Sequence, residues 1–273
     1  MGTLYVVATP IGNLSDITLR ALEVLKAVDR VCCEDPRHTR KLLTHFGISK
    51  PTTSYFAGNE GGRTGEVLSR LEGGESIALV SDAGTPGISD PGYLLVRACR
   101  ERGIPVVPVP GPSALAAALS VAGIPADRVL FLGFPPRRKG ERERLLGSLA
   151  SDPSTLVFYE APHRVRAFLR EAAARLPGRE CVVARELTKR FESIAPAASP
   201  EDVPDKGEFA LLFGPPAPVR RAGLDEPGLS EEVEALVAAG HREKEAIREA
   251  ARRRGMRRRE AYSLLKVRPR EDP

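Results

Sequence analysis

Three short segments rich in glycine, proline and small polar residues have the composition of a small-molecule site in this 273-residue chain. Residues 9–13 read TPIGN, residues 81–92 read SDAGTPGISDPG, and residues 110–114 read PGPSA, each directly after an apolar run. Glycine lets a backbone approach a ligand closely, and proline stiffens a loop. A single such segment is an ordinary turn. Three of them at strand ends predict a ligand pocket, because open α/β sheets bind ligands beyond the carboxyl ends of their strands.

Several other chemistries lack their sequence signatures. The chain has no G-x-x-x-x-G-K-[ST] phosphate loop and no G-x-G-x-x-G run after a strand. No G-x-S-x-G nucleophile motif occurs. The spacing of the four histidines does not match that of metal ligands: they are His38, His45, His163 and His241. We therefore do not expect a P-loop hydrolase, a Rossmann dehydrogenase or a serine hydrolase. We also expect no bound metal.

Alternating strands and helices are predicted to position these segments. Apolar runs at residues 4–8, 31–33, 77–80 and 106–109 predict strands. Helices are expected over residues 17–28, 37–46, 64–71 and 93–102, with Ser15 or Asp16 as the cap of the first. Because these strands are apolar without alternation, they predict an α/β domain with a mostly parallel sheet covered on both faces.

A second α/β domain and a small helical part are expected further along the chain. Strands are predicted at residues 129–133, 155–159, 181–185 and 209–213, with a helix over 164–176. A Pro/Gly-rich linker over 215–227 precedes two expected helices, about 244–254 and 258–266, that break at Gly255-Met256. The predicted domains are residues 1–110, 111–218 and 219–273. The first boundary falls as late as residue 137 if the PPRRKG segment marks it.

Positive charge is concentrated at the C-terminal end. Residues 241–273 hold 12 Lys/Arg and 6 Asp/Glu, a net charge of +6, whereas the whole chain carries +5 and the first 240 residues therefore carry −1. A cationic segment beside a near-neutral body favours a polyanionic partner, nucleic acid before membrane, and a solubilising helix pair is the alternative. The predicted RNA-binding residues are Arg137, Arg138, Arg252, Arg253, Arg254, Arg257, Arg258 and Arg259.

Composition and cysteine placement predict a cytoplasmic globular protein. Hydrophobic residues make up 42% and charged residues 28%, which excludes disordered and collagen-like chains. The most apolar stretch, residues 114–126, is shorter than the roughly 20 residues that a membrane-spanning helix needs. The N-terminus lacks the features of a signal peptide. Without CxxC spacing, reduced thiols are expected for Cys32, Cys33, Cys99 and Cys181.

The strand-end segments belong to a longer series of ordered blocks. These are LYVVATPIGN (4–13), EDPRHT (34–39), residues 79–92, residues 109–113, YEAPHR (159–164), ARELTK (184–189) and GEFA (207–210). In this order the chain resembles the ribosomal RNA small-subunit methyltransferase I family of the tetrapyrrole methylase superfamily. The resemblance covers residues 4 to about 214, and the basic tail resembles the C-terminal helical module of that family. Pro36 departs from the family pattern, and no histidine precedes Asn59-Glu60.

The resemblance implies a fold, a reaction and a set of site residues. The fold would be two α/β domains of the tetrapyrrole methylase type with S-adenosylmethionine bound in the cleft between them, in a homodimer. The reaction would be 2′-O-methylation of a cytidine in the decoding centre of small-subunit (16S) ribosomal RNA, as free RNA or within the assembled subunit. The donor-binding residues carried over by position are Pro10, Asp82, Gly84, Ile88, Ser113, Ala114, Tyr159, Arg185 and Ala210.

Methyl transfer from a sulfonium needs an in-line approach and a base for the proton of the nucleophile. The candidate bases are Asp35, Asp82, Asp90, Glu160, Glu186 and Lys189. Helix capping by Asp35 and Asp90, or an ion pair between Glu186 and Lys189, are structural alternatives. The sequence leaves this choice open.

Two other functions also stay open. Another member of the superfamily would methylate a porphyrinoid or act as a diphthine-type enzyme, but neither substrate needs an arginine-rich helix pair. A non-catalytic RNA-binding protein would bind RNA but not S-adenosylmethionine, so a donor-binding measurement separates it from the enzyme.

Overall fold

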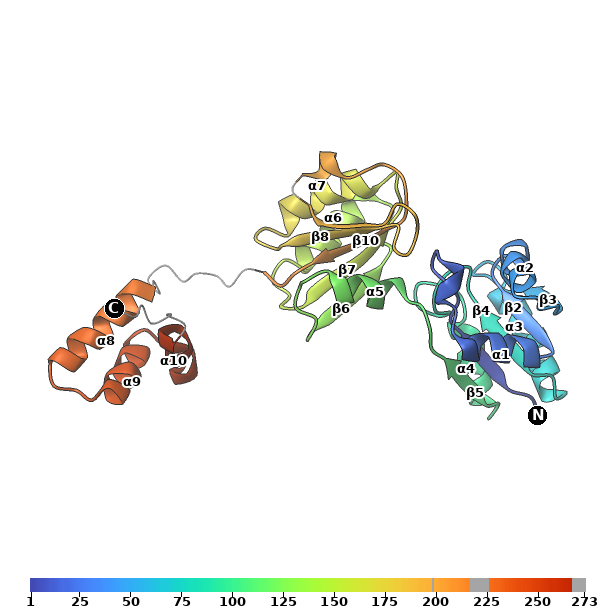
Figure 1. Ribbon diagram of the computed structural model, residues 1–273, viewed down its shortest axis with the longest axis horizontal. Coiled ribbons are helices and arrows are strands. Elements are labelled where there is room, and N and C mark those ends of the chain that lie inside the picture. Colours follow the sequence, from blue (N-terminus) through green and yellow to red (C-terminus); the bar gives the residue numbers. More distant parts are fainter. Residues whose placement is uncertain (198, 217–225, 267–273) are drawn as a thin grey trace. The chain divides into compact units, whose positions relative to one another are not determined.

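The computed structural model describes residues 1–197, 199–216 and 226–266. The chain forms two compact units, Met1–Pro216 and Ala217–Pro273. In the described residues the first unit holds two five-stranded sheets, and the second holds helices (Figure 1). The predicted divisions of the chain at residues 110 and 218 stay predictions.

The first sheet is entirely parallel, as the uninterrupted apolar strands predicted. Its strands are β1 (Leu4–Val7), β2 (Arg30–Cys33), β3 (Thr52–Ser54), β4 (Ile77–Val80) and β5 (Val106–Val109). They lie in the order β3-β2-β4-β1-β5, with every pairing parallel. Strand β3 was not predicted because it consists of three hydroxyl-bearing residues and has no apolar run. Strand β1 lies between β4 and β5, so the loop that follows it emerges between theirs.

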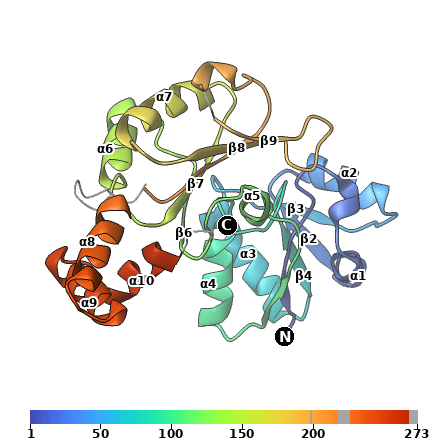
Figure 2. The ribbon, with the colours of Figure 1, turned by 60° about the vertical axis from the view of Figure 1, so that its left-hand side comes forward.

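Helices cover both faces of this sheet (Figure 2). They are α1 (Leu19–Ala27), α2 (Pro36–His45), α3 (Glu60–Glu72) and α4 (Tyr93–Glu101). Alternation along β2 divides its side chains: Val31 and Cys33 pack with α1 and α2, whereas Cys32 packs with α3 and α4. The prediction of Ser15 or Asp16 as the cap of α1 was wrong. Thr18 Oγ1 accepts the Ala21 amide at 3.1 Å instead, because residues Leu14–Asp16 form a separate 3-10 turn, η1.

The second sheet is mixed and differs in topology from the first. Its strands are β6 (Val129–Gly133), β7 (Thr155–Glu160), β8 (Cys181–Arg185), β9 (Ser193–Pro196) and β10 (Phe209–Phe213), in the order β6-β7-β10-β8-β9. Only β6 and β7 pair in parallel among these strands, and β10 is buried along its whole length. Helices α6 (Lys139–Ser148) and α7 (Val165–Arg175) pack on one face, with the short 3-10 turn η2 (Pro200–Asp202) beside α7. Helix α5 (Ala114–Val121) packs on the other, and α5, α6 and β9 were not predicted.

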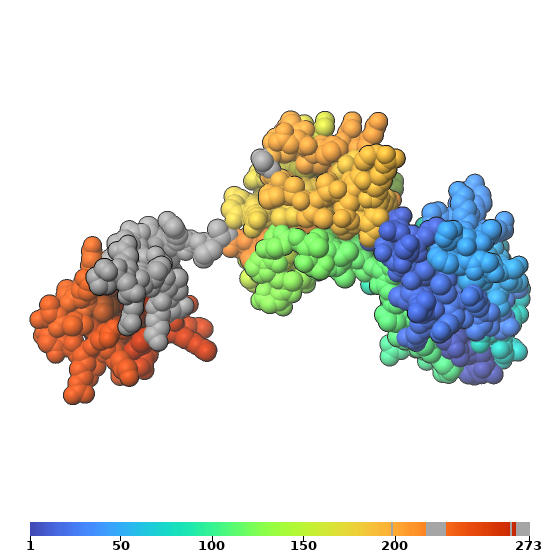
Figure 3. All heavy atoms as spheres, viewed as in Figure 1, coloured from blue at the N-terminus to red at the C-terminus, as the bar shows by residue number. Residues whose placement is uncertain are grey.

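The C-terminal unit is a small bundle of α8 (Glu226–Ala238), α9 (Glu243–Arg253) and α10 (Arg258–Lys266) in its described part. Each of these helices contacts the other two, and Figure 3 shows their atoms, in orange to red, in one compact group. Its core includes Leu229, Ile247 and Ala261. The predicted helices over 244–254 and 258–266 are confirmed, and Gly255 between them has φ +62, the left-handed conformation that ends a helix. Helix α8 was missed because the predicted linker overlapped its start.

The four cysteines are free thiols, and Cys32, Cys33 and Cys99 are buried. Burial raises the pKa of Cys32 and of Cys181 to about 12, so both are protonated at neutral pH. Across the described ranges, the helices are all too short or too polar to cross a membrane.

Candidate active site

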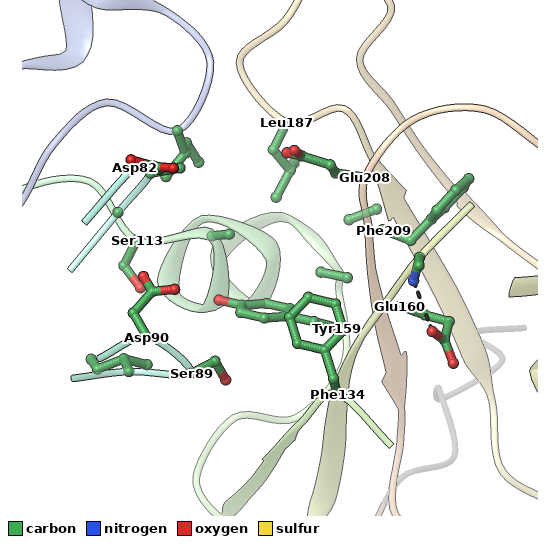
Figure 4. Close-up of a pocket in the computed structure, with 18 of the residues that line it drawn as sticks. Asp82, Ser89, Asp90, Ser113, Phe134, Tyr159, Glu160, Leu187, Glu208 and Phe209 are labelled. Carbon is green, nitrogen blue, oxygen red and sulfur yellow. Dashed lines mark hydrogen bonds between the residues drawn. The ribbon is translucent and has the colours of Figure 1, made fainter. Parts of the chain in front are cut away.

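A cavity of about 360 Å³ lies between the carboxyl end of the first sheet and one face of the second (Figure 4). This volume is within the range of small-molecule sites, about 300–1,000 Å³. Its walls come from the loops that follow β1, β4 and β5, from α5, and from β7, β8 and β10. The first sheet contributes the carboxylates of Asp82 and Asp90, and the second contributes apolar walls such as Tyr159 and Ala210.

The three glycine- and proline-rich loops are joined by hydrogen bonds. The Thr9 amide donates to the Gly84 carbonyl at 2.8 Å, and the Gly84 amide donates back to the Thr9 carbonyl at 3.0 Å. Thr85 Oγ1 donates to the Pro112 carbonyl at 3.2 Å. Gly84 has φ +84, a backbone conformation in which any residue with a side chain is strained. The expectation that these loops meet at one sheet edge is therefore confirmed.

Most residues predicted to bind the donor line this cavity. Those in its wall are Asp82, Gly84, Ile88, Ser113, Ala114, Tyr159 and Ala210. Pro10 is buried one position before Ile11, which takes its place in the wall. Arg185 is also outside the wall, and its guanidinium donates to the carbonyl groups of Lys206 at 2.7 Å and Phe191 at 3.3 Å. Arg185 thus braces the loops around the cavity.

Asp90 is a half-buried carboxyl group on the first-sheet side of the cavity. Burial and the negative charge of Asp82 raise the pKa of Asp90 to about 6, although a hydrogen bond from Ser81 opposes them. The pKa of Glu34, at the end of β2, is also raised by burial and by Asp82 and Asp90. This side of the cavity therefore concentrates negative charge and favours a cationic ligand.

Asp35 and Asp82 have different environments although both were candidate bases. Asp35 caps α2: Oδ1 accepts the Arg37 amide at 2.8 Å, and the Arg37 guanidinium holds the pKa of Asp35 down at about 2. Asp82 accepts the Asp35 amide at 3.1 Å and lines the cavity. Asp82 also borders an adjacent groove that contains Asp35 and Phe56. The structure therefore places Asp82 in the cavity wall and Asp35 beside it.

Tyr159 and Glu160 are neighbours on β7 and project to opposite faces of the sheet, since strand side chains alternate. The Tyr159 ring lies over the cavity, whereas the Glu160 carboxyl group lies behind the strand (Figure 4). That side chain is 0% exposed, and its Oε1 accepts from the Ala161 amide at 2.8 Å and from Arg164 Nε at 2.7 Å. Glu160 is thus part of the wall, but its carboxylate is held by Arg164.

Glu186 and Lys189 form the ion pair that was the structural alternative to catalysis. Lys189 Nζ donates to Glu186 Oε1 at 3.1 Å and to Glu208 Oε2 at 2.7 Å. Neither Glu186 nor Lys189 lines the cavity, whereas Leu187 between them does. Glu186 and Thr188 have φ +51 and +66, so this loop is strained and held by its contacts.

Gly12 marks where the loop after β1 meets this strained loop. A Cβ atom there would lie 2.5 Å from Lys189 Cγ and 2.8 Å from Thr188 Oγ1. Only glycine permits that approach, which brings the two sheets together on one side of the cavity. Sequence reasoning missed Leu187 and also Phe134, which follows Gly133 at the end of β6. The available sequence signal for Phe134 was Gly133, a glycine at the end of a predicted strand like those in the other cavity loops.

The predicted RNA-binding arginines of the C-terminal unit divide into two groups. Arg254 Nε donates to Glu232 Oε2 at 2.8 Å, and Arg252 and Arg253 pair with Glu249. Arg258 lies over the Tyr262 ring at 5.5 Å. Arg257 and Arg259 are exposed. Arg254 therefore stabilises the bundle through α8, whereas Arg252, Arg253 and the three arginines after Gly255 are exposed.

The whole chain resembles a set of methyltransferases. Residues 3–201 match the family of tetrapyrrole (corrin/porphyrin) methylases. The chain is 47% identical to the ribosomal RNA small subunit methyltransferase I of Synechocystis sp., over 97% of both chains. It is 53% identical to the protein of the same name from Pseudomonas aeruginosa, over 71% of this chain and 69% of the relative.

Solved structures share the fold. A diphthine synthase aligns with a TM-score of 0.60 at 12% identity, covering 78% of this chain and 90% of that chain. A uroporphyrin-III-C-methyltransferase from Thermus thermophilus aligns with a TM-score of 0.56 at 21% identity, covering 78% of this chain and 94% of that chain. These similarities concern the fold alone, and they place the two sheets in a known methyltransferase architecture.

Proposed function

Because the chain belongs to the tetrapyrrole methylase family, and within it to the ribosomal RNA small subunit methyltransferase I proteins, we propose that it methylates small-subunit ribosomal RNA with S-adenosylmethionine as donor. The acceptor is the 2′-hydroxyl of a cytidine in the decoding centre. The observation that carries this proposal is a cavity between two α/β sheets whose loops match the family blocks, in a chain 47% identical to a relative of that name over nearly its full length. The porphyrinoid and diphthine alternatives have support only at the level of the fold.

The residues of the cavity fit this donor. When bound, S-adenosylmethionine supplies an electrophilic methyl group on a positively charged sulfonium. The carboxylates of Asp82 and Asp90 provide the complementary charge. Gly84 leaves its backbone accessible, since it has no side chain to fill the space beside Ile11. Tyr159 and the surrounding apolar wall exclude water, which strengthens those charge interactions.

Asp82 is the proton acceptor in this proposal. Its carboxylate lines the cavity, and Oδ1 is oriented by the Asp35 amide at 3.1 Å. Within the described residues no cation pairs with Asp82, in contrast to the carboxylates of Asp35, Glu160 and Glu186. As the ribose oxygen bonds to the methyl carbon and the carbon–sulfur bond breaks, the hydroxyl proton passes to Asp82. Such base catalysis contributes about 10²–10⁴-fold.

RNA binding is assigned to positive charge outside the cavity. Arg137 and Arg138 follow β6, and Arg257 and Arg259 both follow Gly255, at the start of α10. Such guanidinium groups contact phosphates and position RNA without reading its bases. We also propose that the chain forms a homodimer, as the family resemblance implies. Light scattering should then give a mass in solution of twice 29.5 kDa.

Small ribosomal subunits from cells that lack this protein provide the test. The purified chain should transfer tritium from methyl-labelled S-adenosylmethionine to the RNA of these subunits. Nuclease digestion and mass spectrometry should then recover one 2′-O-methylated cytidine. Donor binding without transfer to RNA, or label on a porphyrinoid or on protein, would overturn the proposal.

A further inference from the structure

Phe134 presents an aromatic ring at the edge of the cavity. It is 58% exposed, although burial of a phenylalanine side chain is normally favourable. Its ring lies edge-to-face with Tyr159, at 5.8 Å between centroids, and both rings belong to the cavity wall (Figure 4). Tyr159 contacts Phe131 in turn, at 5.0 Å. The exposed ring therefore has firm support on one side and an accessible face on the other.

Buried charges hold the loop that carries this ring. Arg142 is 8% exposed and forms a two-point ion pair with Glu171, at 2.6 and 2.7 Å. The same guanidinium donates to the carbonyl groups of Pro136 at 3.2 Å and Arg137 at 3.0 Å. Burying such a pair costs desolvation energy, which only good geometry offsets. The backbone after Phe134 is thus fixed by side chains from α6 and α7.

Two further contacts fix the loop at its beginning. Arg164, already paired with Glu160, donates to the Pro135 carbonyl at 3.2 Å. Gly133 has φ +59, and a Cβ atom there would lie 2.7 Å from Ser89 Oγ, in the loop that follows β4. This close approach sets the direction in which the chain enters Phe134. The ring is therefore presented by a rigid loop beside the cavity.

Positive charge continues directly from this ring. Arg137, Arg138 and Lys139 follow within five positions, and the Arg138 side chain is 85% exposed. An exposed aromatic ring next to exposed cations is the pattern of single-stranded nucleic-acid sites, where bases stack on rings and cations follow the phosphates. The phenyl ring has no hydrogen-bonding group. It can therefore stack on any nucleic-acid base but cannot distinguish one base from another.

We infer that Phe134 is a substrate-binding residue on which one base of the RNA stacks while Arg137 and Arg138 contact the adjacent phosphates. This inference rests on the proposed function and names the surface that brings the RNA strand to the cavity. Loss of one such stacking contact lowers RNA affinity about 10- to 100-fold.

The absence of tryptophan from the 273 residues permits a direct test. In the full chain, Phe134→Trp introduces the only tryptophan, beside the cavity. Small ribosomal subunits, and separately an oligocytidylate, should quench its fluorescence when a base stacks on the indole. Phe191→Trp is the matched control, because Phe191 is 64% exposed, also adjoins an arginine, and lies outside the cavity wall. Equal quenching of both variants, or none in Phe134→Trp, would overturn the inference.

Binding and kinetic measurements separate RNA contact from donor contact. Phe134→Ala should raise the KM for small subunits about 10- to 100-fold and leave the Kd of S-adenosylmethionine unchanged by calorimetry. Phe134→Tyr should restore the KM, and Phe191→Ala should match the unmodified chain. A weakened donor Kd in Phe134→Ala would assign the ring to the donor site. If the unmodified chain methylates small subunits and Phe134→Ala does so equally well, the inference fails while the proposed function stands.

Discussion

The backbone amide of Asp35 donates a hydrogen bond to Oδ1 of Asp82 at 3.1 Å, which joins the ends of neighbouring strands β2 and β4. The Asp35 carboxylate caps α2 and pairs with Arg37, so it is committed to the helix. The Asp82 carboxylate is instead oriented toward the cavity by this amide. These two neighbouring aspartates thus have different surroundings: Asp35 caps a helix, and Asp82 lines the cavity.

Asp82→Asn should lower kcat by about 10²–10⁴-fold, the contribution of a general base. The amide oxygen of asparagine still accepts the Asp35 hydrogen bond, so the loop geometry is retained. Single-turnover methyl transfer to small subunits measures the effect, with donor affinity measured in parallel. Asp35→Asn is the control, since asparagine also caps helices well. Equal losses of kcat in the two variants would remove Asp82 as the base.

Donor affinity should depend on pH through Asp90. Its raised pKa of about 6 means that the carboxyl group is neutral below this pH and negative above it. The attraction for a cationic donor is then present above about pH 6 and lost as the pH falls, with log Kd rising by about one per pH unit. Calorimetry between acidic and neutral pH measures this, and Asp90→Asn should remove the pH dependence. A pH-dependent step of the same size in Asp90→Asn would place the titration elsewhere.

The ionisation of Asp90 should also affect folding, with the opposite sign. Because its pKa in the folded protein is raised by burial, the stability that the protonated group provides is present below its unfolded pKa, about 3.9, and is lost as the pH rises through about 6. Denaturant titrations of the unmodified chain and of Asp90→Asn should therefore show a smaller decrease in unfolding free energy over this interval for the variant. Parallel pH profiles for the two proteins would contradict the assignment.

Ala114→Leu should abolish measurable donor binding without unfolding the chain. Ala114 lines the cavity at the start of α5, so a larger side chain occupies ligand space. Ala116→Leu is the matched control, because Ala116 is exposed on the same helix and leucine is a good helix former. Calorimetry of both variants checks the result. Undiminished binding in Ala114→Leu would move the donor site away from this cavity, and Gly84→Leu, in the loop that follows β4, provides a second test.

Removal of the C-terminal unit after about residue 225 should leave donor binding intact and weaken RNA use. The slope of log RNA affinity against log salt concentration is about 0.7–0.9 for each phosphate contact. Within the full chain, replacement of both Arg257 and Arg259 by alanine should therefore reduce this slope by about one to two. Arg97→Ala is the control, because Arg97 is an exposed arginine on α4, outside the C-terminal unit. If the truncated chain methylates small subunits at the full rate, the C-terminal helices are not needed for RNA binding and only increase solubility.

Local composition and strand pattern determined much of this protein. Uninterrupted apolar runs in strands such as Ile77–Val80 were sufficient to predict a parallel sheet, because only strands buried on both faces lack alternation. The glycine-rich segments identified the edge of the sheet that borders the cavity, since parallel strands bring their carboxyl ends together. Gly255 predicted the break in the C-terminal helices for a similarly local reason.

Tertiary structure alone decided which side chains face the cavity. Glu160 and Tyr159 are neighbours in sequence and both were candidate site residues, but a single step along β7 places one behind the sheet and the other over the cavity. Pairing between distant residues committed Lys189 to Glu208 and Arg142 to Glu171, and neither pairing has a local signal. Phe134 acquired its position through Arg142 of α6 and through Arg164 and Ser89, and the last two lie far from it in the sequence. Local preferences predict elements and their ends, whereas the chemistry of each side chain depends on the partners that the fold brings to it.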